Sequence, residues 1–338
     1  MMISQFRSGA LNAVVLAVGV AAASALGVFP ASSAHAVDGA SGAGQPCVLI
    51  DTDFDIDDLM AIPQVIANRR VAAIITTEGY ALPAQAASAA MKVFGQPGLS
   101  RDIPVIVGAS YPGTRDTSEW PWLLSIRDSM ARANDLFAVP LMPDPRTPAS
   151  PGGLPSTVDR LVRDCSSVDV LVIGAFTSFV KYSPRIRAKI TSVVMQSKPL
   201  RGDPTQRPGH ISFNCQYDLS ACETAFSQLR GLRAVWVDVP RDGPEPYAPN
   251  LAMAEGLRPT GLPGSVRAAL LSNLSTWEVA STVDGNKSLL WDQSASTYLL
   301  HPKLYAKVGG HWEPTIPVET FRRLWTESIN RWNPRGMS

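Results

Sequence analysis

The chain has 338 residues, of which 45% are hydrophobic and 17% are charged, a balance that indicates a globular protein with a substantial buried core. Lys and Arg number 30 against 29 Asp and Glu, so the formal net charge is only +1. Composition therefore provides no net field to attract nucleic acid or an acidic membrane, and we expect a small neutral molecule as the partner.

The N-terminal segment has the layout of an export signal. One basic residue, Arg7, precedes an apolar run over about residues 10–29, and Ala-His-Ala follows at 34–36. This order is typical of a secretory signal peptide, so we expect residues 1–36 to be removed. A retained membrane anchor is the competing interpretation, since ~20 apolar residues span a bilayer, but the Ala-x-Ala ending favours cleavage. We expect an exported protein, periplasmic or secreted, with no membrane segment after cleavage.

Strand-like and helix-like segments alternate after a small-residue linker at 37–46, and the folded domain is expected over 47–338. Apolar runs predict strands, and apolar spacing of three and four residues predicts helices. The strands are expected at 48–50, 71–75, 105–107, 168–173, 193–195 and 234–239, and the helices at 58–68, 84–94, 156–163 and 220–230. This alternation predicts a single α/β domain with a largely parallel open sheet flanked by helices.

One long irregular stretch, residues 111–155, interrupts the alternation. It is rich in Pro and contains Trp120 and Trp122. Loops of this length in a compact domain are usually functional or partly disordered, and we interpret this one as a lid. Either tryptophan is a candidate to stack on a bound base, with a packing role as the alternative.

Four cysteines lie outside the signal: Cys47, Cys165, Cys215 and Cys222. Export allows disulfides, and three pairings are open. Short spacing favours Cys215 with Cys222, and Cys47 and Cys165 each precede a strand-like run that would bring them to one edge of a sheet. Buried thiols remain an alternative for Cys215 and Cys222. No Cys/His cluster indicates a zinc site.

Five aspartates lie within eight residues directly after the first predicted strand, in the sequence DTDFDIDD. Ligands of open α/β sheets bind beyond the carboxyl ends of the strands, where this segment falls. An acidic turn that caps a helix would explain one or two of the five. Five repel one another unless a cation neutralises them, and such hard oxygen ligands suit Ca²⁺ or Mg²⁺. The cluster comprises Asp51, Asp53, Asp55, Asp57 and Asp58.

Two known kinds of acidic loop fit this segment poorly. An EF-hand requires Gly and Glu at positions that Ile56 and Ile62 occupy, so we exclude it. A haloacid-dehalogenase-like phosphatase would use Asp51 as nucleophile and Asp53 as acid/base. That family's pattern continues with Thr or Val where Asp55 stands, and it has no use for the paired aspartates at 57–58. It remains the alternative function.

The aspartate segment resembles the start of the nucleoside hydrolase family, Asp-Thr-Asp-Pro-Gly-x-Asp-Asp followed by an apolar helix. Further segments resemble family motifs in the same order: IITT with Gly79, LVIGAFTSF, SFNCQYDLSACETAF and LLWDQSASTYLLHPKLY. Together they extend over about residues 48–305. The chain is therefore similar to the inosine-uridine preferring, calcium-dependent nucleoside hydrolases, most of all to the branch with Trp before the last metal-binding Asp.

This resemblance implies hydrolysis of the N-glycosidic bond of ribonucleosides to ribose and free base. It implies one Ca²⁺ held by Asp53, Asp58, Asp292 and the backbone carbonyl of Thr177. Asp53 would also accept the proton of the attacking water. A nucleoside is then the expected partner, and a homo-oligomer is possible.

The resemblance also assigns the substrate side of the site. Asp57 and Asn214 would orient the ribose hydroxyls, and Asp218 would be structural. Trp291 stands where many members have a His that protonates the leaving base, so stacking would replace protonation and purines are somewhat favoured. His210, four residues before Asn214, is a further candidate to contact substrate.

Several positions depart from the family pattern. Phe54 and Asp55 replace Pro-Gly, Tyr80 replaces a usual Asn, and Ser212 replaces a ribose-contacting Glu. These departures leave a calcium-dependent nucleoside-binding protein without turnover as an alternative, which the retention of Asp53 argues against. The remaining histidines, His301 and His311, are expected at the surface.

Overall fold

The structure is a computed structural model that describes residues 44–94, 103–120, 123–124, 127, 153–201, 203, 211–241, 245–258, 262–283 and 289–332, without the side chains of 275–283. The expected signal peptide at 1–36, most of the linker and much of the expected lid lie outside these residues. So do Trp122 and His210.

Eight strands form one sheet in the order β3-β2-β1-β4-β5-β6-β8-β7. Every neighbouring pair is parallel except β7 with β8, which are antiparallel. The predicted largely parallel sheet is therefore confirmed. The strands are β1 Gln45–Thr52, β2 Val71–Thr76, β3 Val105–Val107, β4 Cys165–Val172, β5 Ile190–Gln196, β6 Arg233–Val237, β7 Tyr305–Val308 and β8 His311–Pro314.

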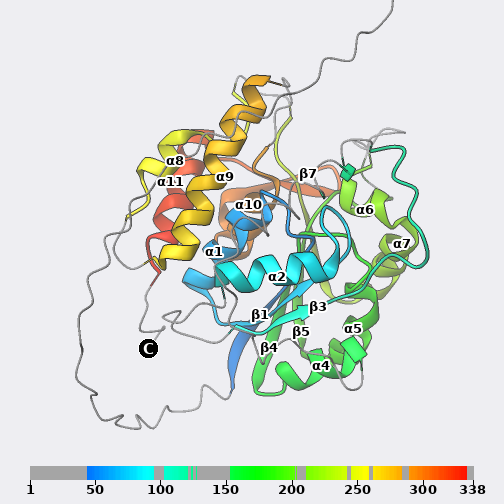
Figure 1. Cartoon of the computed structure of the whole chain (residues 1–338). Coiled ribbons are helices and arrows are strands. Elements are labelled where there is room, and N and C mark those ends of the chain that lie inside the picture. Colours follow the sequence, from blue (N-terminus) through cyan, green and yellow to red (C-terminus); the bar gives the residue numbers. More distant parts are fainter. Residues whose placement is uncertain are drawn as a thin grey trace, which may run out of the picture. The chain divides into compact units, whose positions relative to one another are not determined.

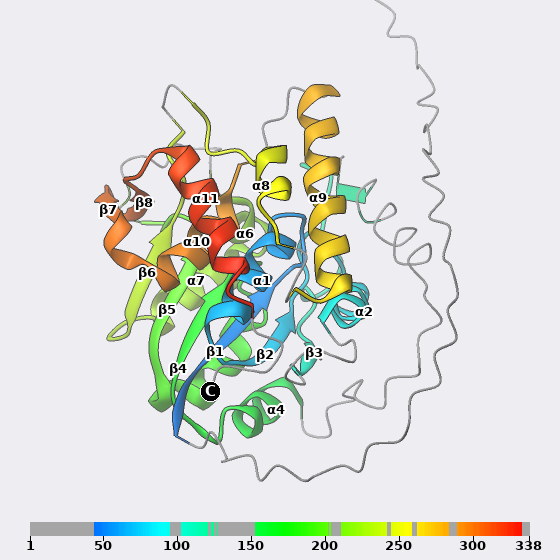
Figure 2. The same ribbon diagram turned by 90° about the vertical axis from the view of Figure 1, so that its left-hand side faces the viewer.

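Helices cover both faces of this sheet. On one face α1 (Asp58–Asn68), α2 (Pro83–Phe94), α8 (Leu251–Glu255), α9 (Gly264–Val283), α10 (Trp291–Leu300) and α11 (Val318–Ile329) contribute to one buried cluster. On the other face α4 (Gly153–Leu161), α5 (Phe179–Ile186) and α7 (Leu219–Gln228) contribute to a second cluster. Figure 1 shows α8, α9 and α11 on the left and α4, α5 and α7 on the right, and Figure 2 shows the first group from its own side. The short helix α6 (Phe213–Tyr217) precedes α7.

The central strands each contain a continuous apolar run because both of their faces are covered. In β1, Val48 and Ile50 belong to the first cluster, whereas Cys47 and Leu49 belong to the second. Successive side chains of a strand point to opposite faces, so one continuous apolar run supplies both cores.

Most predicted elements are observed with small boundary shifts. The helix expected at 58–68 is α1, and the strand expected at 71–75 is β2, which is one residue longer. β1 begins at Gln45, inside the expected linker, because Gln45 pairs with Cys165 of β4. The predictions did not include α5, α6, α8, α9, α10, α11 or the β7–β8 hairpin.

Both disulfides considered from the sequence are present, Cys47–Cys165 and Cys215–Cys222. The first joins the amino-terminal parts of β1 and β4, and the second joins α6 to α7.

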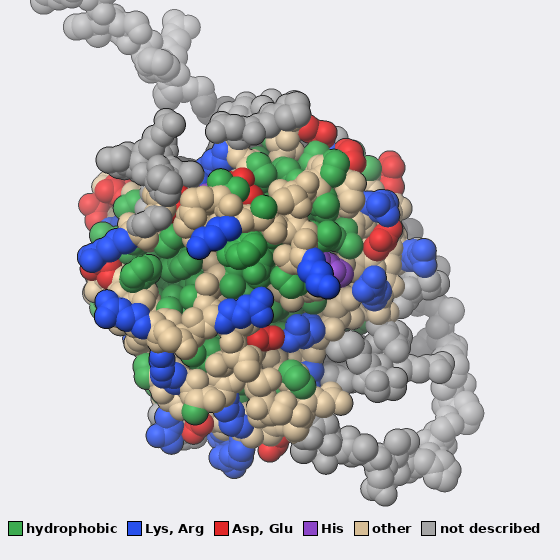
Figure 3. All heavy atoms as spheres, turned by 180° about the vertical axis from the view of Figure 1, so that it is seen from behind, with side chains coloured by type: hydrophobic (Ala, Val, Ile, Leu, Met, Phe, Trp, Pro, Cys, Tyr) green, Lys and Arg blue, Asp and Glu red, His purple; other side chains and the backbone are tan. Residues whose placement is uncertain are grey.

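Within the described part of the chain, no helix combines the length and apolar character needed to cross a membrane. Figure 3 shows the face opposite to that of Figure 1, where Lys and Arg side chains are spread among acidic and hydrophobic ones.

Candidate active site

The aspartate segment connects β1 to α1 at the carboxyl ends of the parallel strands. Asp51 and Thr52 end β1, and α1 begins at Asp58. The turn between them places Phe54 at φ 60°, a left-handed conformation that is uncommon for a residue other than Gly. Phe54 nevertheless buries its ring, which packs edge-on against Phe94 at 6.5 Å between centroids. The family's Pro-Gly turn is thus replaced by a strained turn that a buried aromatic ring holds in place.

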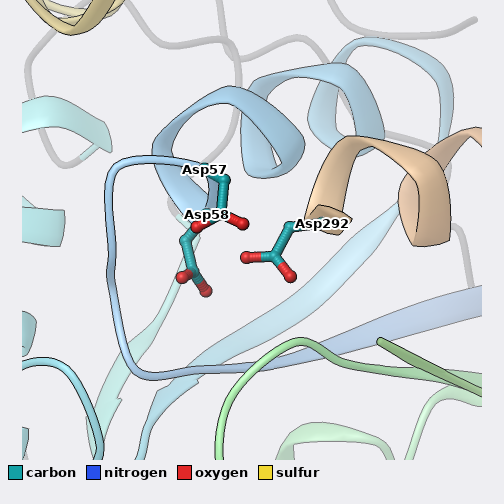
Figure 4. Close-up of side chains that lie close together, drawn as sticks. All are labelled: Asp57, Asp58 and Asp292. Carbon is teal, nitrogen blue, oxygen red and sulfur yellow. The ribbon is translucent and has the colours of Figure 1, made fainter. Parts of the chain in front are cut away.

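Three carboxylates from two helices meet beside this turn. One oxygen from each of Asp57, Asp58 and Asp292 lies within 4.8 Å of the others, and all three residues are buried. Figure 4 shows Asp57 and Asp58 where α1 begins and Asp292 where α10 begins, with their carboxylates directed toward one another. The structure therefore brings together the expected ligands Asp58 and Asp292, which are far apart in sequence. It adds Asp57, for which sequence reasoning gave a ribose role.

Asp53 interacts electrostatically with Asp57 and Asp58 and is closely framed by backbone. Its Oδ2 accepts a hydrogen bond from the Tyr80 N–H at 2.7 Å. A Cβ at Gly79 would overlap the Asp53 carboxylate, and a Cβ at Gly174 would lie 2.5 Å from the Asp53 nitrogen. Both glycines are therefore required for the loops after β2 and β4 to approach Asp53. Tyr80, a departure from the family pattern, contributes its backbone to this frame.

Burial raises the pKa of every carboxyl group in this region. Burial, opposed by the hydrogen bond from Tyr80 and reinforced by the charge of Asp57, raises the pKa of Asp53 to about 7. Burial raises the pKa of Asp57 to about 6, against hydrogen bonds that lower it. Burial and the neighbouring carboxylates raise the pKa values of Asp55, Asp58 and Asp292 well above their ordinary range. These groups resist joint ionisation unless a cation lies among them.

Asp51 points to the opposite face of the sheet from Ile50, toward α5. The two carboxyl oxygens of Asp51 and the Tyr182 hydroxyl are buried, and no other described group hydrogen-bonds to them. Burial raises the pKa of Asp51 well above its ordinary range, and the hydroxyl of Tyr182, which faces it, lowers that pKa in part. Such a group is suited to a protonated structural role.

The donor set fits a hard divalent cation. Carboxylate oxygens from two helices converge in a buried space, with Asp53 coupled electrostatically to the same group. Calcium and magnesium take oxygen ligands of this kind, whereas the described residues bring no sulfur or imidazole to the cluster. This cluster could therefore hold a metal ion.

Asn214 lies at the same edge, on α6. Its Nδ2 is 3.2 Å from the carbonyl oxygens of Ile173 and Gln196 and 3.0 Å from Gln196 Oε1. These contacts fix the amide at the carboxyl ends of β4 and β5. Asn214 is therefore placed beside the carboxylate edge, as the motif assignment requires.

Thr177 lies in the loop after β4. Its hydroxyl donates to Asp218 Oδ2 at 2.8 Å, and Asp218 also caps α7 by accepting from the Ala221 N–H. The side chain of Thr177 is thereby occupied, which leaves the predicted ligand role to its backbone carbonyl. The structural role expected for Asp218 agrees with these contacts.

Trp291 is the first residue of α10 and immediately precedes Asp292. Its indole is partly buried, its Nε1 has no hydrogen-bond partner, and the Arg241 guanidinium lies 5.8 Å from its ring centroid. The indole therefore belongs to the residue next to Asp292, packs in part against the core and has the Arg241 guanidinium over its ring. Ser212, where the family has a Glu, hydrogen-bonds to the Ser197 hydroxyl.

Trp120 packs among other aromatic residues. Its ring stacks on Tyr217 at 5.8 Å and meets Phe213 at 5.2 Å, and the Arg115 guanidinium lies 4.8 Å from it. Only 7% of Trp120 is exposed, so packing accounts for its position without a ligand.

The expectation that His311 lies at the surface is wrong. His311 is fully buried, with Nδ1 2.5 Å from Asp203 Oδ2 and Nε2 2.8 Å from Glu313 Oε1. Burial lowers its pKa, but the hydrogen bonds to Glu313 and Asp203 outweigh burial, so the pKa of the imidazole is raised. Sequence position near the C-terminus did not reveal these partners. His301 is partly exposed.

Sequence reasoning also missed a buried polar group beside the site, Glu78 with Tyr217 and Arg127. The Tyr217 hydroxyl donates to Glu78 Oε1 at 2.6 Å, and Arg127 Nη2 donates to the same hydroxyl at 2.8 Å. One signal was available. Glu78 follows a buried strand at its carboxyl end, as Asp51 to Asp58 do.

The sequence matches a known protein family. A family model described as inosine-uridine preferring nucleoside hydrolase matches residues 48–323. No curated protein matches the sequence.

Solved structures share the fold at low sequence identity. A purine-preferring ribonucleoside hydrolase from Gardnerella vaginalis is 17% identical, with a TM-score of 0.60 over 86% of this chain and 99% of that chain. A plant nucleoside hydrolase, PpNRh1, is 17% identical, with a TM-score of 0.56 over 84% and 98%. An inosine-guanosine nucleoside hydrolase is 14% identical, with a TM-score of 0.60 over 85% and 99%. At these identities the similarity establishes the fold.

Proposed function

We propose, on the premise that this chain belongs to the inosine-uridine preferring nucleoside hydrolase family, that it is an exported calcium-dependent enzyme that prefers purine ribonucleosides. The chain is a hydrolase that acts on the N-glycosidic bond of ribonucleosides, as this family does. This family membership replaces the two alternative functions, the haloacid-dehalogenase-like phosphatase and the nucleoside-binding protein without turnover. The ion, the base preference and the site of action are our proposals.

The observation that carries the proposal is the convergence of Asp57, Asp58 and Asp292 within 4.8 Å beside the buried Asp53. Bound Ca²⁺ would neutralise these carboxylates and orient both the ribose diol and the attacking water. Asp53, Asp58, Asp292 and the Thr177 carbonyl are the proposed ligands.

Asp53 is the proposed base. The Tyr80 N–H holds its Oδ2, and the close approach of Gly79 and Gly174 fixes its position. A carboxyl group whose pKa is raised to about 7 is well matched to accept a proton from water near neutral pH. Fixing water against the anomeric carbon can lower the barrier by as much as about 7 to 11 kcal/mol.

Ribose is held by Asp57 and Asn214 in this proposal. Asn214 is fixed at the ends of β4 and β5 through Ile173 and Gln196, so its amide is preorganised and does not have to order on binding. Asp57 lies close enough to Asp58 and Asp292 to contact the ribose, the ion or both.

The purine preference rests on Trp291 and on the names of two similar structures, a purine-preferring ribonucleoside hydrolase and an inosine-guanosine nucleoside hydrolase. An indole next to the last metal-binding Asp offers a stacking face, which contributes roughly 1 to 3 kcal/mol per base. Stacking favours the larger purine ring.

Export is supported by the signal-like segment at 1–36 and by the two disulfides. Disulfides form and persist in oxidising compartments and are rare in the cytosol.

The experiment incubates the purified chain, beginning at residue 37, with calcium and equal concentrations of four ribonucleosides, and measures free ribose. We expect inosine and guanosine to be hydrolysed faster than uridine and cytidine. Trp291→Ala should lower purine turnover strongly while Trp291→Phe retains much of it. Equal rates for all four nucleosides, unchanged in Trp291→Ala, would remove the purine proposal and leave the hydrolase activity standing.

A further inference from the structure

Glu78 is a buried carboxylate that the reaction described above does not use. Its side chain is 12% exposed and lies in the loop after β2. Oε1 accepts the Tyr217 hydroxyl at 2.6 Å and Oε2 accepts the Tyr111 N–H at 3.0 Å. The nearest cation, Arg127, lies 3.9 Å from Oε1. A buried carboxylate is retained at a cost unless its hydrogen bonds are satisfied, and here two donors satisfy it.

On one side, Glu78 belongs to the segment that positions Asp53. The Thr77 N–H donates to the Thr52 carbonyl at 2.8 Å, and the Ala81 N–H donates to the Asp53 carbonyl at 3.1 Å. Between them, the Tyr80 N–H holds the Asp53 carboxylate. A shift of Glu78 therefore moves the backbone that fixes Asp53.

On the other side, Tyr217 belongs to the helix that carries Asn214. Both residues lie in the five-residue α6, three positions apart. The ring of Tyr217 is buried against Trp120 and Phe213, so its hydroxyl has a fixed direction. Arg127 steadies the contact, since its Nη2 donates to the Tyr217 hydroxyl and also to the Gly79 carbonyl.

We propose that Glu78 and Tyr217 are positioning residues whose hydrogen bond sets the placement of the Asp53 loop relative to the Asn214 helix. This inference rests on the proposed function, because it assumes that Asp53 handles the water and Asn214 the ribose. The two groups must face one substrate at the same time, and they come from elements with no backbone connection nearby. The Glu78–Tyr217 contact spans 139 positions of sequence and joins them directly.

The test uses Tyr217→Phe, which removes the hydroxyl and keeps the packed ring. Tyr247→Phe is the matched control, because it removes a hydroxyl that donates to the backbone carbonyl of Ile316 and keeps the Tyr247 carbonyl that accepts from the Leu290 N–H beside α10. Glu78→Gln and the double variant with Tyr217→Phe complete a cycle. Each protein is measured for kcat and KM with inosine, calcium affinity by calorimetry and thermal midpoint.

We expect Tyr217→Phe to keep wild-type calcium affinity while kcat/KM falls by about 10- to 100-fold, the scale of a misplacement of about 1 Å. Tyr247→Phe should lower the thermal midpoint with less than about a twofold change in kcat/KM, because a remote hydrogen bond affects stability alone. Glu78→Gln should reproduce the loss, and the double variant should lose no more than the worse single variant, because one interaction is shared.

Wild-type kcat/KM in Tyr217→Phe, or losses that add fully in the double variant, would overturn the inference while the hydrolase assignment stands. Failure of the wild-type protein to release ribose would instead remove the proposed function, so the two failures are distinguishable.

Discussion

Polar groups are arranged differently at the two ends of the parallel strands. At the amino ends the polar groups are paired. The Cys47–Cys165 disulfide closes β1 to β4, Arg69 forms an ion pair with Asp169 at 2.6 Å, and Lys189 Nζ donates to the Cys165 carbonyl at 3.1 Å. Each of these groups has its partner within the protein. The contacts therefore stabilise the fold without a bound ligand.

At the carboxyl ends, acidic groups are gathered, and no described Lys or Arg forms an ion pair with Asp53, Asp57, Asp58 or Asp292. Asp53, Asp57, Asp58 and Asp292 are buried, they raise one another's pKa values, and the turn at Phe54 is strained. These buried carboxylates destabilise the metal-free protein, and a bound cation would make the same arrangement favourable. The amino ends of the strands therefore stabilise the fold, and the carboxyl ends are arranged to bind a ligand.

The largest effect is expected from breaking the carboxyl end. Asp58→Asn and Asp292→Asn should each abolish calcium binding and lower ribose release by a factor on the order of 10⁴. Asp292→Asn removes a buried charge from a repelling group, so it should not lower the thermal midpoint of the metal-free protein. Asp58→Asn should lower it, because both Asp58 oxygens accept hydrogen bonds, from the Thr52 hydroxyl and the Asp55 N–H, and Asn keeps only one acceptor. Calorimetry and unfolding on the same samples check this. Undiminished calcium affinity in both variants would remove the metal assignment.

Breaking the amino end should have the reverse outcome. Replacing Cys47 and Cys165 by Ala frees a loop of 118 positions and should lower the free energy of unfolding by about 4 to 5 kcal/mol. Calcium affinity and turnover per folded molecule should stay at the wild-type level. The Cys215 and Cys222 pair, separated by 7 positions, is the comparison, with an expected loss of about 2 kcal/mol and a raised KM because it adjoins Asn214. Equal effects of the two disulfides on KM would contradict the division between the ends.

Sequence reasoning reached the parts of the site that are encoded locally. Asp53, Asp57 and Asp58 lie in one acidic run after an apolar strand, so composition and position identify them. Asp292 required a resemblance, because nothing in its own neighbourhood marks a metal ligand.

Contacts between distant segments stayed out of reach. Glu78 meets Tyr217 across 139 positions, and His311 meets Asp203 across 108, and neither partner carries a pattern that names the other. The central strands were predictable because they are apolar on both faces. The β7–β8 hairpin at the edge was not, because its strands are only four residues long and mix polar with apolar residues.

The pH dependence of stability tests the carboxyl end of the sheet without mutation. The pKa of Asp53 is raised to about 7 and that of Asp57 to about 6 from 3.8 in the unfolded chain. The folded protein then binds more protons than the unfolded one between these values, so stability is full below about pH 4 and falls as pH rises through 6 and 7.

Urea unfolding at pH 5, 6, 7 and 8 should therefore show the metal-free protein losing stability toward pH 8. Saturating calcium should remove most of this decline, because the ion replaces the protons. Asp53→Asn should flatten the metal-free curve in part. A metal-free protein that is more stable at pH 8 than at pH 5 would contradict the raised pKa values.

The smallest effect is expected at His311, which lies near the carboxyl edge but is fully paired. Its pKa is raised by Glu313 and Asp203, so its contribution to stability is present below about pH 6.5 and is lost as pH rises through the higher folded value. His311→Gln should cost about 1 to 3 kcal/mol at pH 6 and less at pH 9, with or without calcium. A loss that calcium reverses would assign His311 to the metal group instead.

The most direct test of the central claim is free ribose released from inosine by the wild-type chain and by Asp53→Asn, each with calcium and with a chelator. We expect the wild-type chain to release ribose with calcium, and we expect release to be lost both with chelator and in Asp53→Asn, whose folding is preserved. Calcium-independent release, or an Asp53→Asn variant as active as wild type, would contradict it.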